Sequence, residues 1–425
     1  MIRSVLEFIE LPVKISPADV KVGYAIKLPV GWMKHPFLTN KLVVENQQQV
    51  RIIQSLDLEF VYFYPERSSV ALDNPSEPQE QASLDIADIQ AKTEMQHEKM
   101  RRIEQAKAQR RELQKTEKAF AQSVVQVRQL MSQIGSRPLN AIQDADMLVG
   151  QLADTILGAD ALVLHLISQA GKEQEGLYYH ALNVSILSMM LAKQLKFSAE
   201  QVKLVGLGAL FHDIGKLKVP AQILRKTTAL TTPEENFLKL HGKLGLDLLK
   251  LSDQFPDAAK TIVEQHHEYL DGSGYPAGLK AEQIDKLARA VAVVNEFDNL
   301  CHPVDPSKAR SPHHALSAMY KSMKGKLGDV EMKLLIKMMG IYPPGTVVQL
   351  SDQRIGIVLS VNEEAMLYPN ILIYDPDVPR LEAPVITLAA DGLKIEKAIR
   401  AKSLPPEVYG YLNPRAQISY YVQQK

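Results

Sequence analysis

A long stretch of helical periodicity is the feature that most constrains what this chain can fold into. Residues 139–340 read as a succession of amphipathic helices, with apolar positions spaced three and four apart. Two capping boxes begin helices within it, Ser198–Gln201 and Thr232–Glu235, the second with proline at the first helical position. Gly340 and the prolines that follow it end the last helix. The sequence therefore predicts a mainly α protein with a helical bundle at its centre.

The segments on either side of the bundle lean toward β structure. Residues 1–70 contain short runs rich in β-branched and aromatic residues, KLVV at 41–44 and LEFVYFY at 58–64. Residues 346–425 contain apolar runs, some of them alternating with polar residues, between turn signals. We expect a small, mainly β module at each end of the chain.

Residues 71–138 combine a linker with a long helix. The composition from about Ser69 to Ala82 is rich in Asn, Pro, Ser, Glu and Gln, which is typical of a linker. Over 103–134 the spacing alternates between three and four, a heptad seam interrupted by Arg110 and Glu117. Two interpretations stay open: a single helix packed on its neighbour, and a homodimer contact through residues 103–134.

The composition limits the class of protein. Apolar residues make up 46% and charged residues 23% of the 425 residues, which fits a soluble globular protein of several domains. The 49 basic and 49 acidic residues balance, so a general affinity for nucleic acid or membrane surfaces is not expected. Cys301 is the sole cysteine, and no apolar stretch is long enough to span a membrane. The N-terminus does not read as a signal peptide, so we expect a cytoplasmic protein.

Five of the eleven histidines form an ordered series near the ends of predicted helices. They are His180, His212, His241, His266 and His267. Asp213 directly follows the second of them. A lone histidine on an apolar helix face is usually a core residue bonded to a carbonyl. Imidazoles and carboxylates gathered from several helices, in contrast, build two-metal sites, and they suit iron, manganese, nickel or zinc.

Two segments make the pattern specific, HDIGK at 212–216 and HHEYLDGSGYP at 266–276. With KVP at 218–220 and ARAVAVVNEFDNL at 288–300, they resemble the HD-GYP family, a branch of the HD phosphohydrolases. Residues 1–70 are similar to the small domain of unknown function that often precedes HD-GYP domains. The resemblance places an HD-type helical bundle, the catalytic domain, at residues 139–345.

The resemblance implies a metal-dependent phosphodiesterase of bacterial signal transduction, which hydrolyses cyclic di-GMP to pGpG and, by a second cut, to GMP. It implies a binuclear site in which Asp213 bridges two divalent ions about 3.5–4 Å apart. Iron or manganese is expected first, and nickel, zinc or magnesium stay open. The implied metal ligands are His180, His212, Asp213, His241, His266, His267 and, at the last ligand position, Asn295.

The resemblance also implies residues that act on the substrate. Asp213 and Lys216 are the implied catalytic residues, because the ammonium group one helical turn after Asp213 can reach a phosphate oxygen. The implied substrate-binding residues are Lys216, Gly274, Tyr275 and Pro276, and Lys308 or Arg310 could supply the phosphate contact that a basic segment makes in the family. In the family the GYP loop is associated with GGDEF-domain diguanylate cyclases, which are therefore expected partners.

Three positions and one segment depart from the family pattern. Asn295 stands where the family usually has an aspartate, so one negative charge is missing from the implied metal site. Gly176 replaces a glutamate that supports a third metal in some members, which favours two metals here. Tyr269 occupies a position that is commonly arginine, and residues 301–310 replace a basic segment.

Two alternatives therefore remain from the sequence. The domain could bind cyclic di-GMP as a signalling module with weak or no catalysis. It could also apply the same chemistry to another cyclic dinucleotide, such as cyclic GMP-AMP.

Overall fold

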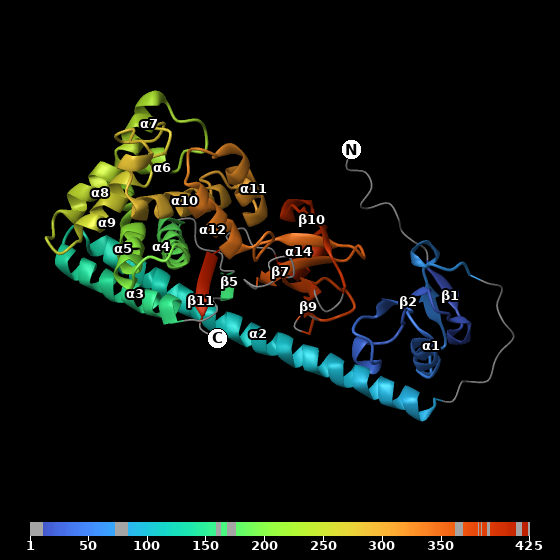
Figure 1. Ribbon diagram of the computed structural model, residues 1–425. Coiled ribbons are helices and arrows are strands. Elements are labelled where there is room, and N and C mark those ends of the chain that lie inside the picture. Colours follow the sequence, from blue (N-terminus) through green and yellow to red (C-terminus); the bar gives the residue numbers. More distant parts are fainter. Residues whose placement is uncertain are drawn as a thin grey trace. The chain divides into compact units, whose positions relative to one another are not determined.

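The computed structural model describes residues 12–72, 84–158, 163–167, 176–361, 369–380, 382–383, 385–388, 392–413 and 419–423. The chain divides into two compact units (Figure 1). One comprises Met1–Gln109 with Tyr374–Val385, and the other Arg110–Ile373 with Ile386–Lys425. Most of the linker expected between Ser69 and Ala82 lies outside the described residues.

The N-terminal unit is built on a small antiparallel sheet with the strand order β1-β4-β2-β3. Its strands and helix are β1 (Val13–Ile15), β2 (Ala25–Lys27), β3 (Lys41–Val43), α1 (Gln47–Gln54) and β4 (Val61–Phe63). Short 3-10 helices span Pro17–Asp19, Trp32–Lys34 and Pro65–Arg67. Asn46 caps α1 by accepting a hydrogen bond from the Gln49 amide. Apolar residues of the strands and of α1 form one buried core, as the β-leaning runs predict.

A single long helix, α2 (Ile86–Gln133), follows. Its first part belongs to the N-terminal unit, where the carboxylate of Asp88 pairs with Arg51 of α1 at 2.7 Å. In the second unit, Phe120, Val127 and Met131 of the predicted seam are buried in the core. This part of the seam is therefore covered by the chain's own helices, as the single-helix interpretation expects.

The second unit is a helical bundle (Figure 1). Its main helices are α3 (Pro138–Gly158), α4 (Gly176–Gln194), α5 (Ala199–Phe211), α7 (Thr232–Lys239), α8 (His241–Leu249), α9 (Asp257–Gln265), α10 (Lys286–Cys301), α11 (Pro312–Ser322) and α12 (Asp329–Met339). Shorter elements are η5 (Ile214–Lys218), α6 (Ala221–Leu224) and the 3-10 helices Ala281–Gln283 and Pro306–Lys308. Helix α4 packs against α5 and α10, α5 packs against α9, and α8 packs against η5. One continuous apolar core joins these helices.

The helix starts agree closely with the capping signals. Ser198 and Gln201 form the predicted capping box of α5. The second box lies one residue earlier than predicted, because Thr231 and Glu234 form it and Thr232 is already helical. Thr231 and Thr232 are adjacent, and residue type alone could not choose between them.

The C-terminal segment adds a five-stranded sheet with the order β10-β6-β7-β8-β9. Its strands are β6 (Val347–Leu350), β7 (Ile355–Ser360), β8 (Asn370–Ile373), β9 (Val385–Thr387) and β10 (Ile395–Ile399). After it come the 3-10 helix Ala401–Ser403, α14 (Pro406–Leu412) and β11 (Ser419–Gln423), which pairs with β5 (Val163–Ile167). The predicted fold class, a helical core with small β parts at both ends of the chain, is confirmed.

Candidate metal centre

Three histidines of the predicted series lie at the junctions where helices end. His212 follows α5, His241 follows α7, and His266 follows α9. In each, Nδ1 lies 2.6–2.8 Å from the carbonyl oxygen three residues earlier. Those last-turn carbonyls lack partners within the helix, so the ring satisfies one of them and is held in place.

This bonding fixes where the second ring nitrogen points and what it can do. A carbonyl only accepts, so each of the three Nδ1 atoms carries the hydrogen, and a neutral ring has its lone pair on Nε2. His180 Nε2 lies 3.1 Å from His212 Nε2, and His241 Nε2 lies 3.2 Å from His266 Nε2. Two facing lone pairs repel each other unless a proton or a cation lies between them. The arrangement therefore suits cation binding.

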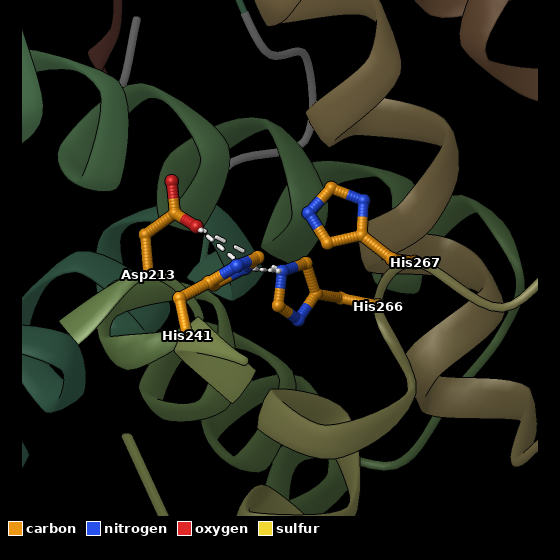
Figure 2. Close-up of side chains that lie close together, drawn as sticks. All are labelled: Asp213, His241, His266 and His267. Atoms are coloured by element: carbon orange, nitrogen blue, oxygen red, sulfur yellow. Dashed lines mark hydrogen bonds and ion pairs between the residues drawn. The ribbon is translucent and has the colours of Figure 1, made fainter. Parts of the chain in front are cut away.

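Asp213 lies at the centre of these rings, directly after α5. Figure 2 shows its carboxylate facing His241, with His266 and His267 beyond. Its Oδ1 lies 3.2 Å from His241 Nε2, and its Oδ2 lies 3.4 Å from His212 Nε2. The buried Oδ1 accepts no well-aligned hydrogen bond from the described residues. A buried oxygen without a donor costs free energy unless a ligand satisfies it.

Burial and charge set the protonation states of the cluster. Burial lowers the pKa of His212, and it holds the pKa values of His266 and His267 well below their ordinary range. Burial alone would raise the pKa of Asp213, but the Lys216 ammonium and neighbouring rings bring that pKa well below its ordinary value. Neutral imidazoles beside an ionised carboxylate are the forms that bind metal ions.

Asp298 orients His180, which lies in the first half of α4. Its Oδ2 lies 2.6 Å from His180 Nδ1, and its Oδ1 accepts a hydrogen bond from Asn183. The carboxylate fixes the hydrogen on Nδ1 and leaves Nε2 directed at His212. The sequence did not predict this contact of Asp298 with the ring of His180.

The loop at 266–276 shapes the other side of the cluster. Tyr275 stacks on His267 with ring centroids 4.6 Å apart. Glu268, which the sequence left without a role, is buried and accepts hydrogen bonds from the Ala277 and Leu279 amides. A Cβ at Gly274 would lie 2.3 Å from the backbone nitrogen of Tyr269, so only glycine fits there.

A second glycine sets how closely Asp213 and His241 can approach. A Cβ at Gly215 would lie 1.8 Å from the carbonyl oxygen of His241. The glycine of the HDIGK segment therefore permits η5 to pack directly on the start of α8. A larger residue would separate the carboxylate from the imidazole.

Other predicted site residues are placed less directly. Asn295 is buried on α10, where its Oδ1 accepts a hydrogen bond from Asn299 at 2.9 Å. Lys308 is 71% exposed and lies 3.7 Å from Asp305. Arg310 is exposed, and its backbone amide bonds to the carbonyl of Leu300. The contacts of these three residues do not join them to the cluster. Pro276 follows Tyr275 through a cis peptide bond.

The residues brought together can hold a metal ion at two positions that share Asp213. Asp213, His241, His266 and His267 offer ligand atoms within 4.8 Å of one another, and so do His180, His212 and Asp213. Their chemistry, neutral imidazoles around a carboxylate, fits first-row transition metals.

Among the described residues, no helix has the length and hydropathy of a membrane-spanning segment.

Comparison with protein families agrees with this geometry. Residues 162–329, which contain all six cluster residues, match the family model of the HD domain. The chain carries an HD domain. Residues 13–145 match a domain of unknown function (DUF3391), so that match extends beyond residues 1–70 through α2 into α3. The predicted combination of an HD domain and a small preceding domain is confirmed.

Three proteins similar to this chain have names that describe an activity. The cyclic di-GMP phosphodiesterase PA4108 of Pseudomonas aeruginosa is 32% identical over 54% of this chain and 55% of its own length. The cyclic di-GMP phosphodiesterase response regulator RpfG of Xanthomonas campestris is 37% identical over 34% of this chain and 39% of its own. The 3'3'-cGAMP-specific phosphodiesterase 1 of Vibrio cholerae is 36% identical over 29% of this chain and 28% of its own length. The chain thus spans about half, or less, of these relatives.

Proposed function

We propose that this chain is a metal-dependent phosphodiesterase that hydrolyses cyclic di-GMP to pGpG, with GMP as the product of a second cut. The facing Nε2 atoms around Asp213 support the proposal most strongly, because neutral rings so placed need a cation between them. The phosphodiesterase names of the relatives support the reaction class.

The proposed ligands are His180, His212, Asp213, His241, His266 and His267, with Asn295 as a weaker, uncharged donor. Iron or manganese is the proposed ion, because imidazoles and a carboxylate without thiolates suit these metals. When bound, a pair of ions would lower the pKa of a water molecule and stabilise charge on the phosphoryl oxygens. Asp298 contributes by orienting the ring of His180.

Lys216 and the GYP loop supply the proposed contacts to the substrate. The Lys216 ammonium lies 2.5 Å from Asp213 Oδ2 and its side chain is 23% exposed, so it can turn toward a phosphate oxygen. Tyr275 stands against His267 at the edge of the cluster, and Gly274 keeps the adjacent backbone close. Lys308 and Arg310 are proposed as further phosphate contacts because both are exposed cations.

Replacing Asp213 by alanine tests the proposal. The variant should stay folded but lose both bound metal and turnover of cyclic di-GMP, because the shared carboxylate joins the two ligand groups. Metal quantification of the purified protein, combined with chromatography of the products, measures both. Asp257→Ala is the matched control, because the Asp257 side chain is 96% exposed. Unchanged turnover in Asp213→Ala would refute the assignment.

A module that binds cyclic di-GMP with weak or no catalysis is the second candidate. The amide at Asn295 favours it, because an amide brings no negative charge to a bound cation. Bound nucleotide without product in the same assay would support this module. The 3'3'-cGAMP-specific relative favours testing cyclic GMP-AMP in parallel.

Three parts of the proposal concern the surroundings of the enzyme. The GYP loop is the proposed contact with GGDEF-domain diguanylate cyclases, and residues 103–134, apart from the buried Phe120, Val127 and Met131, are the proposed contact of a homodimer. The heptad spacing supports the dimer. The sole cysteine, Cys301, is free and buried, which supports a reducing, cytoplasmic compartment.

A further inference from the structure

The two oxygens of the Asp213 carboxylate have different neighbours. Oδ1 faces His241 Nε2 at 3.2 Å and His266 Nε2 at 3.8 Å. Oδ2 faces His180 Nε2 at 3.5 Å and His212 Nε2 at 3.4 Å, and it also accepts a bond from Lys216 Nζ at 2.5 Å. One oxygen is therefore open toward the rings, and the other already holds a cation.

The two ligand groups also differ in the number of imidazoles that they contain. The group on the Oδ1 side combines three imidazoles with the carboxylate, whereas the group on the Oδ2 side has two imidazoles with the same carboxylate. Oδ1 is buried without a hydrogen-bond donor among the described residues. Oδ2 has its negative charge balanced by the Lys216 ammonium.

We infer that Lys216 competes with the second metal ion for Asp213 Oδ2, so that the two positions fill in order and with unequal affinity. The His241 side takes the first ion whether or not Lys216 is present. The His180 side takes an ion only when the ammonium leaves Oδ2. This inference rests on the proposed metal binding and adds a role to Lys216 beyond its contact with phosphate.

The physical basis is repulsion between like charges near one oxygen. An ammonium at hydrogen-bond distance from the buried Oδ2 would lie beside any cation bound there, and the two positive charges would repel each other. The lysine stem has several rotatable bonds, and the side chain is partly exposed, so the ammonium can leave the carboxylate for solvent. Competition of this kind weakens the second ion without abolishing its binding.

Lys218 provides a matched control in the same element. It lies two residues further along η5 and is exposed, so its charge contributes to the field of the segment without contacting Asp213. If only the general positive charge of η5 weakened the second ion, Lys218→Gln and Lys216→Gln would have similar effects. If the contact with Oδ2 is responsible, only Lys216→Gln will change the binding.

Titration of the metal-free full-length protein with Co²⁺ or Mn²⁺, followed by calorimetry and by cobalt absorption, tests this inference. We expect two unequal equivalents in the native protein. In Lys216→Gln the second equivalent should tighten about tenfold while the first stays the same. Lys216→Arg keeps the charge and should keep the weak second equivalent, and Lys218→Gln should resemble the native protein. Circular dichroism checks that each variant is folded.

The outcomes separate this inference from the proposed function. Two equal equivalents in the native protein, or a second equivalent that Lys216→Gln leaves unchanged, would overturn the inference even if cyclic di-GMP is hydrolysed. Unequal equivalents with the expected dependence on Lys216, but no turnover of any cyclic dinucleotide, would uphold the inference and refute the proposed hydrolysis.

Discussion

Polar side chains are buried in both the N-terminal unit and the HD domain, but they are partnered differently. In the N-terminal unit, Lys99 Nζ donates to the carbonyls of Trp32 and His35. His35 Nε2 bonds to Asn40 Oδ1 at 2.9 Å, and Asn40 Nδ2 donates to the Val30 carbonyl. Burial lowers the pKa of Lys99 to about 8 and that of His35 to about 4. Each of these donors is matched to an oxygen of the same unit, and only the acceptor His35 Nδ1 is buried without a partner among the described residues of this group.

In the HD domain the buried histidine rings lack a hydrogen-bond donor for one of their two nitrogens. Each ring of His180, His212, His241 and His266 satisfies its Nδ1, yet its Nε2 faces another Nε2. The comparison teaches that a buried polar group closed by its own chain has a structural role. A cluster of buried acceptors that face one another without a donor is suited to bind a cation. The two regions should therefore respond in opposite ways to substitution and to metal.

The largest effect is expected from His266→Gln. It removes one of three imidazoles on the Oδ1 side, so turnover should fall to background and metal should no longer stabilise the HD domain. In the native protein, metal at a hundredfold excess over its Kd should add about 2.7 kcal/mol to the free energy of unfolding. Denaturant unfolding with and without metal measures the difference.

The exposed His97 on α2 offers the control for that substitution. His97→Gln should keep both turnover and the stabilisation by metal. If metal still stabilises the His266→Gln variant, the facing Nε2 atoms do not bind the metal ion. The proposed difference between the two regions would then be wrong.

Lys99→Met should act on stability alone. It leaves two buried carbonyls without their donor, and we expect a loss of about 2–3 kcal/mol in the unfolding of the N-terminal unit. The ring centroid of Trp32, the sole tryptophan, lies 4.4 Å from Lys99 Nζ, so the fluorescence of Trp32 reports on this unit. Metal content and turnover per folded molecule should not change.

Lys118, exposed on the same long helix, provides the control. Lys118→Met should leave the fluorescence-detected transition in place. A loss of bound metal in Lys99→Met would show that the polar group in the N-terminal unit is not merely structural.

The sequence grouped the residues of the His/Asp cluster much better than the polar groups buried in the N-terminal unit. The histidines form an ordered series along the sequence, and the segments HDIGK and HHEYLDGSGYP marked most of them together with Asp213. His35 and Asn40 lie five residues apart, but Lys99 donates to carbonyls 67 and 64 residues earlier in the chain, so it meets them only through tertiary packing. No local pattern encodes that meeting.

The roles of residues within the site were also only partly predictable. The carbonyl acceptors of the rings follow from helix ends, but the contact between Asp298 and His180 joins residues 118 apart in the sequence. Glu268 gave no signal, because its partners are backbone amides of a loop whose path the sequence does not determine. Contacts set by tertiary packing are therefore the part that sequence reasoning misses.

Asp298→Asn tests whether orientation of a ring matters as much as its presence. The amide can no longer act as a charged acceptor for His180 Nδ1, so metal affinity or turnover should fall about 10–100-fold. Metal titration of the variant measures the change, and the loss should concern the ion bound on the Asp213 Oδ2 side. An equal loss on both sides would mean that Asp298 supports the whole helix α10 rather than one ring.

Asn295→Asp should have the smallest effect. Unlike the other substitutions, it adds a charged group to the HD domain. A carboxylate buried beside Asn299 destabilises the metal-free protein, yet it adds charge to the helix face that also carries Asp298. If Asn295 is a ligand, metal affinity should rise up to about tenfold, with a smaller gain in turnover. Asn299→Asp adds the same charge one turn further along α10 and should give no such gain. Equal gains in both variants would indicate a general effect of charge on α10, and lower turnover in Asn295→Asp alone would show a site adapted to the amide.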